Sequence, residues 1–311
     1  MSLKQTIDVF ELLDDAHVTG GTVKQFLEAR GAKHITVTTV EGKKGLTDFI
    51  NIAIPGLRGH SLSGKAPTLG IVGQLGGIGA RPERIGLVSD ADGAIAALAS
   101  ALKLIDMQNK GDILSGDIIV TTHICPNAPT RPHYPVAFMS SPVDSHTMSQ
   151  YAVTEEMDAV ISVDTTKGNR LLNYRGIAIS PTVKEGYILK FSDDLIQLLE
   201  MSTGRPAHTF AISMQDITPY GNDLYHVNGI MQPATSTTAP VVGLAITTES
   251  AVPGSATGAS HEIDIALAVK FLLEVAKAFG VGQCPFYNRA EFVELTRRYG
   301  KMTHLQTLGS A

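Results

Sequence analysis

Short β-type segments alternate with longer helical patterns along most of this 311-residue chain. Runs of β-branched and aliphatic residues, such as AVISV at 159–163 and VVGLAIT at 241–247, indicate strands, and apolar side chains at helical spacing indicate the intervening helices. Strands that alternate with helices in this way pair mostly in parallel, because each helix returns the chain to the same end of the sheet. We therefore expect an α/β fold, a doubly wound and mostly parallel sheet with helices on both faces.

The expected elements can be placed by residue number. Helices are predicted over residues 5–15, 21–30, 92–107, 145–156, 193–201 and 262–279. Strands are predicted over residues 34–40, 67–72, 117–122, 159–163, 209–213 and 241–247, with more β structure within 175–190. Asp90 or Asp92 is placed to cap the third helix, and Ser260 to cap the last. Since no linker or charge block divides the pattern, we expect a single domain over residues 1–311.

Composition narrows the classes of partner. Charged residues make up 18% of the chain, below the roughly 25% usual for soluble domains, which favours much buried surface and a homo-oligomer. The net charge of −5 and the scattered Lys and Arg residues predict neither a nucleic acid nor a membrane partner. The acidic N-terminal segment and the lack of a long apolar run predict a cytoplasmic protein. Its two cysteines, Cys125 and Cys284, are expected to be reduced there.

Polar residues gather just after four of the predicted strands. The segments are GQLGGIGAR after residue 72, HICPNAPTRPH after 122, DTTKGNR after 163 and TESAVPGSATGASHE, which begins at Thr248. Ligands of open α/β sheets bind beyond the carboxyl ends of the strands. We therefore expect the functional site at this edge of the sheet.

Several of these residues allow two interpretations. The glycine-rich run 73–79 is either a phosphate-cradling loop or a tight turn, although it lacks the third glycine of a dinucleotide-binding fingerprint. Asp90 and Asp92 are either a capping pair or site residues. Asp164 either meets a cation, a metal or a ligand, or it caps the turn at 165–168.

Histidine and cysteine residues offer soft ligands for zinc. His123, Cys125 and His133 lie within eleven positions, although structural zinc sites usually show closer repeated pairs. His261 precedes the last helix, where it is either a surface residue or a ligand.

Three short segments resemble motifs of the co-catalytic zinc aminopeptidases and related deacylases. They are IGLVSDADGAIAAL, DAVISVD and SHEID, and they occur in the order of that superfamily within residues 65–280. The resemblance implies a zinc-peptidase-like fold with Asp90 as a ligand that bridges two metals and Asp164 and His261 as further ligands. The whole sequence is also similar to an uncharacterised prokaryotic family of unknown function.

Two motifs of the superfamily are replaced in this chain. Gln74-Leu-Gly76 stands where a His-x-Asp motif would supply the first ligand, and His123-Ile-Cys125 stands where a Glu-Glu pair would supply the base and a ligand. An ordinary two-zinc mechanism is therefore not expected. The resemblance instead leaves one divalent metal, with zinc as the expected ion, and a ligand set drawn from Asp90, His123, Cys125, Asp164 and His261.

Three functional hypotheses follow from the sequence and the resemblance. The first is a metal-dependent hydrolase of an amide, peptide or related small cytosolic compound, with His133 or Glu262 as leading candidates for the base and His146 and Glu249 as others. The second is a non-catalytic member of the fold that binds a small anionic metabolite. Its binding residues would lie in and after the glycine-rich run, at Gln74, Gly76 and Arg81. A structural oligomer subunit without a site is a third possibility.

Overall fold

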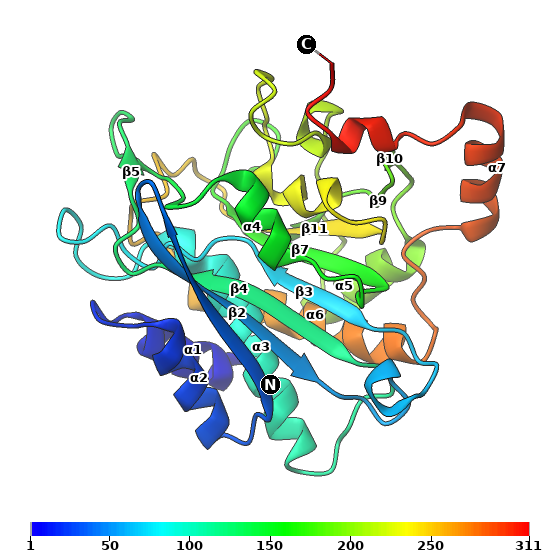
Figure 1. Ribbon diagram of the computed structural model, residues 1–311, viewed down its shortest axis with the longest axis horizontal. Coiled ribbons are helices and arrows are strands. Elements are labelled where there is room, and N and C mark those ends of the chain that lie inside the picture. The colour runs from blue at the N-terminus through cyan, green and yellow to red at the C-terminus, as the bar shows by residue number, and fades with distance from the viewer. Residues whose placement is uncertain (1, 311) are drawn as a thin grey trace.

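A nine-stranded mixed sheet forms the centre of the computed structural model, which describes residues 2–310 (Figure 1). Its strands follow the order β1-β2-β4-β3-β7-β11-β9-β10, and β8 pairs with β11 beside this path. The four central strands are parallel: β4 (Ile118–Ile124), β3 (Leu69–Gly73), β7 (Ala159–Thr166) and β11 (Val241–Thr247). The predicted α/β fold is confirmed, with its parallel strands at the centre of the sheet.

Antiparallel strands extend the sheet on both sides. They are β1 (His34–Gly42), β2 (Gly45–Ile54), β8 (Gly176–Ile179), β9 (Val183–Lys184) and β10 (Tyr187–Ile188). A separate hairpin-like pair is formed by β5 (Thr130–Arg131) and β6 (Phe138–Met139).

Helices cover both faces of the sheet. They are α1 (Leu3–Leu13), α2 (Gly20–Ala29), α3 (Asp92–Gln108), α4 (Ser145–Ala152), α5 (Asp193–Thr203), α6 (Glu262–Gly280) and α7 (Arg289–Tyr299). Figure 1 shows α4 in front of the sheet and α3 and α6 behind it. Within residues 2–310, no helix combines the length and the apolar character needed to cross a bilayer.

The alternation of side chains along each strand explains the two cores. Ile161 of β7 packs into a large core with α3 and α6, whereas its neighbour Val160 packs into a second core with the 3-10 helix η4 (Gly229–Thr235). Helix α3 is buried on nearly all sides, and its many alanines let it approach the sheet closely. It leads from the carboxyl edge of the sheet, so the residues at its start lie where the sequence predicts a site.

Three elements differ from the sequence prediction. Strand β2 was not predicted, but it pairs with both β1 and β4. Helix α7 was not predicted either, because Phe292 is its one buried side chain and leaves little apolar pattern. The predicted strand at 209–213 is wrong: Thr209 makes a single bridge to Ile179, since no neighbouring strand continues the ladder there.

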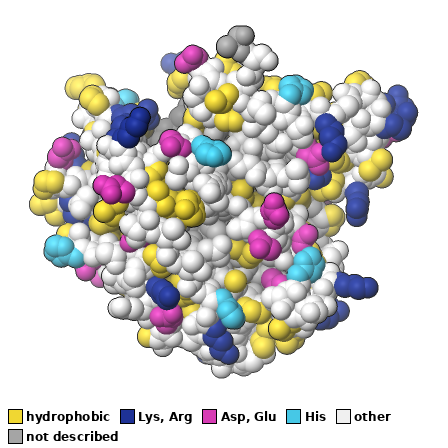
Figure 2. Space-filling view, in the orientation of Figure 1, with side chains coloured by type: hydrophobic (Ala, Val, Ile, Leu, Met, Phe, Trp, Pro, Cys, Tyr) yellow, Lys and Arg dark blue, Asp and Glu magenta, His cyan; other side chains and the backbone are white. Residues whose placement is uncertain are grey.

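Hydrophobic and charged side chains are intermixed on the face that Figure 2 shows, with most Lys and Arg side chains toward its margins. Ile85, in a loop beside the carboxyl edge, is 95% exposed. The homo-oligomer expected from composition stays a prediction.

Replacing Leu98 of α3 with alanine tests the importance of the large core. Leu98 is fully buried, so Leu98→Ala is expected to lower the free energy of unfolding by about 2–5 kcal/mol. The exposed Ile85 provides the control, because Ile85→Ala should change it by less than about 0.5 kcal/mol. Urea unfolding measures both, and equal losses would contradict this packing.

Candidate functional site

The ends of the central strands bring polar side chains to one edge of the sheet. Gly73 of β3 is the register partner of Val163, and the Gln74 N–H donates to the Val163 carbonyl at 2.9 Å, which continues the ladder by one residue. Paired residues of parallel strands point to the same face. Gln74 and Asp164 therefore point to the face covered by α4 and η4, whereas Thr165 points toward α3.

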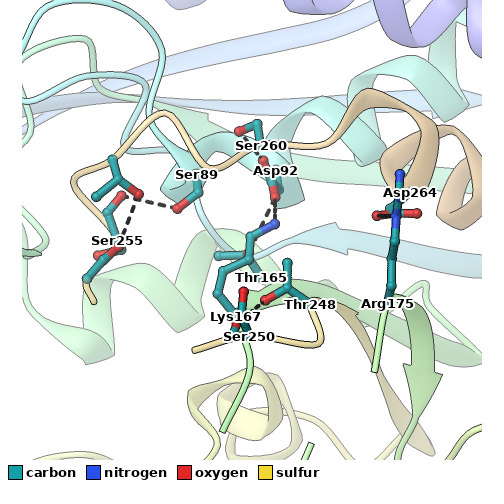
Figure 3. A network of polar contacts seen from close by, with 12 residues as sticks. Ser89, Asp92, Thr165, Lys167, Arg175, Thr248, Ser250, Ser255, Ser260 and Asp264 are labelled. Carbon is teal, nitrogen blue, oxygen red and sulfur yellow. Dashed lines mark hydrogen bonds and ion pairs between the residues drawn. The ribbon is translucent and has the colours of Figure 1, made fainter. Parts of the chain in front are cut away.

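A buried ion pair lies at this edge between the start of α3 and the end of β7 (Figure 3). Lys167 Nζ is 2.5 Å from Asp92 Oδ2, and the two side chains are 6% and 0% exposed. The Ser260 hydroxyl donates to Asp92 Oδ1 at 2.5 Å, and the Thr165 hydroxyl to Oδ2 at 3.3 Å. These four residues, the Asp92–Lys167 centre, join three segments that are distant in sequence.

The partners of Asp92 show that two predicted caps are wrong. Ala91 occupies the N-cap position of α3, without a side-chain capping bond, and His261 occupies that of α6. Instead, the Ser260 hydroxyl donates to the Asp92 carboxylate, and the same carboxylate accepts from the ammonium of Lys167. A charge-assisted contact in a buried place stabilises more than an exposed helix cap does.

Asp90 lies two residues earlier and is half-buried. Its carboxyl accepts hydrogen bonds from the Gly77 N–H and the Ser255 side chain. Burial raises the pKa of Asp90 well above its usual value, and the charges of Asp164 and Asp92 raise it further. A Cβ atom on Gly77 would lie 2.4 Å from Asp90 Oδ2, so the glycine permits this close approach.

Asp164 is more deeply buried than Asp90 and has fewer hydrogen-bond donors. Its side chain is 8% exposed, and among the described residues its hydrogen-bond donor is the neighbouring Thr165 backbone N–H. Burial raises the pKa of Asp164 to about 7, and the charge of Asp92 adds to this rise. Tyr220 lies close enough for the charge of Asp164 to act on it. The residue is 42% exposed, but partial removal of its hydroxyl from water, and then the charge of Asp164, raise the pKa of Tyr220 to about 12.

His123 and Cys125 are held within the fold. The Thr47 hydroxyl lies 2.8 Å from His123 Nδ1, and the imidazole also hydrogen-bonds the backbone of Gln74. Burial lowers the pKa of His123 to about 4, which keeps the ring neutral. The Cys125 thiol points to the Leu46 carbonyl at 3.4 Å, and burial raises its pKa to about 11.

The remaining candidate ligand and bases lie toward the solvent. His261 is half-buried at the start of α6, and Glu262 beside it is exposed. His133 is exposed between β5 and β6, where its Nδ1 lies 2.9 Å from the Val136 carbonyl. Neither His133 nor Glu262 has a contact with Asp164 or Asp90 among the hydrogen bonds and ion pairs of the described chain.

The glycine-rich run is bound into the fold as a turn. The N–H groups of Gln74, Gly77 and Ile78 donate to other protein groups, so they are not free to cradle an anion. A Cβ atom on Gly76 would lie 1.7 Å from the carbonyl oxygen of His123. Arg81 donates to the Pro126 carbonyl at 3.3 Å and is 3.5 Å from a carboxylate oxygen of Asp14.

Comparison with known proteins assigns the chain to a family. Residues 38–309 match the model of the family described as Protein of unknown function (DUF1177). The chain belongs to the DUF1177 family. No curated protein matches it significantly.

Solved structures resemble this DUF1177 protein at low sequence identity. The tomato leucine aminopeptidase mutant K354E has a TM-score of 0.52 and 13% identity, and the match covers 87% of this chain and 61% of that one. A glutaminyl cyclase from an Acidobacteriales bacterium has a TM-score of 0.47 and 14% identity over 90% of this chain and 94% of that one. The Legionella pneumophila LapA aminopeptidase has a TM-score of 0.45 and 12% identity over 91% and 70%. The first likeness shows the fold of the DUF1177 protein and not its activity.

The zinc expected from the resemblance does not fit the side chains of this edge. Among residues 2–310, no three His, Cys, Asp or Glu side chains are arranged to hold a metal ion. Asp90 and Asp164 lie at the same edge, but His123 and Cys125 are engaged elsewhere in the fold. The Lys167 ammonium also places a positive charge beside the carboxylates. The described residues of the DUF1177 protein therefore form no ligand set that matches the expected zinc site.

Sequence analysis overlooked the role of Lys167. The segment DTTKGNR places a lysine three residues after the carboxylate at the end of a buried strand, and a carboxylate in such a place usually meets a cation. That pattern indicates an internal counter-ion, but it does not tell which of the nearby carboxylates receives it. Tyr220 gave no comparable pattern, because it lies in an irregular segment before η4.

A groove of about 1100 Å³ lies apart from this edge, between β10, the start of α5 and α7. Its wall includes Phe191, Tyr287 and Leu295, and none of the carboxyl-edge residues described above.

Asp164→Asn is expected to change how stability depends on pH. The folded-state pKa of about 7 lies above the ordinary 3.8, so the native protein binds the extra proton and loses stability as pH rises from about 4 to about 7. Asparagine removes this loss, so the variant should gain up to about 4 kcal/mol relative to wild type between pH 4 and pH 8. Urea unfolding at both pH values measures the gain. Asp112→Asn, at an exposed carboxylate, is the control, and parallel profiles for Asp164→Asn and wild type would refute the expectation.

Proposed function

We propose that this DUF1177 protein is a hydrolase that cleaves an amide or peptide bond of a small compound at the carboxyl edge of its sheet. The observation that carries the proposal is the pair of unlike carboxyl groups at this edge. Asp164 is buried and has no side-chain donor among the described residues, whereas the half-buried Asp90 accepts hydrogen bonds from Gly77 and Ser255.

Two carboxyl groups in unlike surroundings are suited to general acid and base roles. In the proposed reaction, Asp164 takes a proton from a water molecule while the oxygen of that water bonds to the amide carbon. Asp90 in its protonated form gives a proton to the amine nitrogen as the carbon–nitrogen bond breaks. The water is consumed, an acid and an amine are released, and the two carboxyl groups then exchange protons with solvent to return to their starting forms.

The metal-dependent form of this hypothesis has weaker support. It needs Asp90, Asp164 and His261, with His123 or Cys125, around one ion, and the two last side chains are engaged by Thr47 and Leu46. The proposal therefore assigns no step to a metal. Amide and peptide bonds are the first substrates to test because the fold is shared with an aminopeptidase, which is an argument by analogy.

A panel of dipeptides, N-acyl amino acids and simple amides tests the proposal. Wild-type protein should release an amine from at least one of them. Asp164→Asn and Asp90→Asn should lower kcat/KM on that compound by about 10²–10⁴-fold, since each removes a proton-transfer group. Asp112→Asn, at an exposed residue beyond the opposite end of α3 from Asp90, should retain the wild-type rate.

Treatment with a chelator distinguishes the metal-free hydrolase from the metal-dependent one. The rate should stay unchanged after EDTA treatment and gel filtration. Loss of activity in EDTA and its return with zinc would contradict the metal-free assignment, and unchanged activity in both Asp variants would contradict their roles.

A second candidate is a non-catalytic protein that binds a small molecule at the same edge. It is favoured by two buried polar groups that can take further hydrogen bonds. Among the described residues the Asp164 carboxyl accepts from the Thr165 N–H alone, and the Thr247 hydroxyl has no hydrogen-bond partner. Such a ligand would carry an amine or amide donor rather than the anionic group first expected at Gln74, Gly76 and Arg81. Thermal stabilisation without product release, by about 2.7 kcal/mol at 100 times Kd, would favour this candidate.

A further inference from the structure

The three segments that resemble metal-binding motifs do meet in space, but through neighbours of the residues first expected. Asp92 lies two residues after Asp90, Thr165 follows Asp164, and Ser260 precedes His261. The hydroxyls of Thr165 and Ser260 donate to the Asp92 carboxylate, and the same carboxylate contacts one positive charge, the ammonium of Lys167 (Figure 3).

We propose that the Lys167 ammonium is the resident cation of this edge, and that the same oxygen atoms bind a hard divalent cation once the lysine is removed. The proposal concerns cation binding alone and does not depend on the hydrolase proposed above. It accounts for a zinc-peptidase-like fold whose matching segments converge although no zinc ligand set is formed.

Charge balance supports this role. Asp92 is completely buried, and a buried carboxylate needs a cation or protonation to stay in place. Asp90 and Asp164 lie close enough for their charges and that of Asp92 to affect one another. Among the ion pairs of the described residues, Lys167 is the cation that contacts this group, through Asp92, so its removal leaves an excess of negative charge inside the protein.

The donor atoms decide which ion would replace the ammonium. They are the two carboxylate oxygens of Asp92, of which Oδ2 contacts the ammonium, and the hydroxyl oxygens of Thr165 and Ser260, which lie within 3.3 Å of that carboxylate. Oxygen ligands suit Mg2+, Ca2+ and Mn2+, whereas zinc prefers nitrogen and sulfur. Truncating the lysine would also free the space that its buried stem and ammonium now fill.

The backbone around Lys167 is held independently of its side chain. The Val252 N–H donates to the Lys167 carbonyl at 3.3 Å. Gly168 follows with a positive φ of 44°, and a Cβ atom there would lie 2.1 Å from the Ser250 carbonyl oxygen. The close packing of this turn should therefore keep the oxygen atoms in place after truncation.

The test measures Mn2+ uptake by wild type, Lys167→Ala and the double variant Lys167→Ala/Asp92→Asn. After incubation with MnCl2 and gel filtration, elemental analysis should find about one Mn2+ per chain in Lys167→Ala and only background in the other two. MnCl2 should raise the melting temperature of Lys167→Ala by several degrees, as expected for an ion that binds the folded state. ZnCl2 should give a smaller shift. Lys190→Ala, which removes an exposed lysine, is the matched control and should behave as wild type.

Three results would overturn the proposal. The first is Mn2+ uptake by Lys167→Ala no greater than by wild type. The second is stoichiometric uptake by wild type that Asp92→Asn abolishes, since the site would then hold metal beside the lysine. The third concerns folding: Lys167→Gln keeps the size of the side chain without its charge, so failure of both Lys167→Ala and Lys167→Gln to fold in MnCl2 would show that the ion cannot replace the ammonium. None of these readouts depends on catalysis, so they leave the hydrolase proposal unaffected.

Discussion

The carboxyl edge of the sheet depends on one buried ion pair, Asp92 with Lys167. Two charges taken out of water are stable only when they meet each other in good geometry and their remaining hydrogen-bonding positions are satisfied. Thr165 and Ser260 supply the further donors to Asp92. The pair thereby ties together the start of α3, the end of β7 and the segment before α6. These segments also carry the two acids Asp90 and Asp164, so the geometry of the candidate site follows from this contact.

Close backbone approach is the second constraint on this edge. Gly76 and Gly77 lie against His123 and Asp90 at distances that leave no room for a Cβ atom. A small apolar cluster from the loops above, which includes Val88, Cys125 and Met139, packs over the same region. The glycines therefore serve packing and carboxylate binding, and their abundance here does not indicate a phosphate loop. The same packing explains why Cys125 is a buried thiol with a raised pKa rather than a thiolate ligand.

Three carboxyl groups at this edge, those of Asp90, Asp92 and Asp164, differ in their hydrogen-bond and ion-pair partners. Asp92 is paired with an ammonium, and Asp90 accepts hydrogen bonds from a backbone N–H and a hydroxyl. Asp164 accepts, among the described residues, from a backbone N–H alone. Burial acts on all three, but their partners differ, so one carboxylate becomes structural and two keep the capacity to exchange protons. A fold similar to that of a leucine aminopeptidase can thus present acids at this edge although the described residues form no metal-ligand set.

The sequence by itself determined the class of fold and the edge where polar groups collect. Its alternation of strands and helices is a local pattern, and it predicted the parallel centre, α3 and α6 without knowledge of their neighbours. The matching segments around Asp90, Asp164 and His261 were also recognisable from local residues. Strand β2, helix α7 and the fate of residues 209–213 were not, because a strand needs a partner and a marginal helix shows little apolar pattern.

Only the tertiary structure decided which atoms of those segments meet. Asp92 lies 75 residues from Lys167 and 168 from Ser260 along the chain. Whether a carboxylate caps a helix, binds a metal or pairs with a cation depends on its burial and on its distance from each partner. Packing between remote segments sets both quantities. The sequence could therefore indicate that a cation belongs at this edge, but the fold determined that the cation is a lysine.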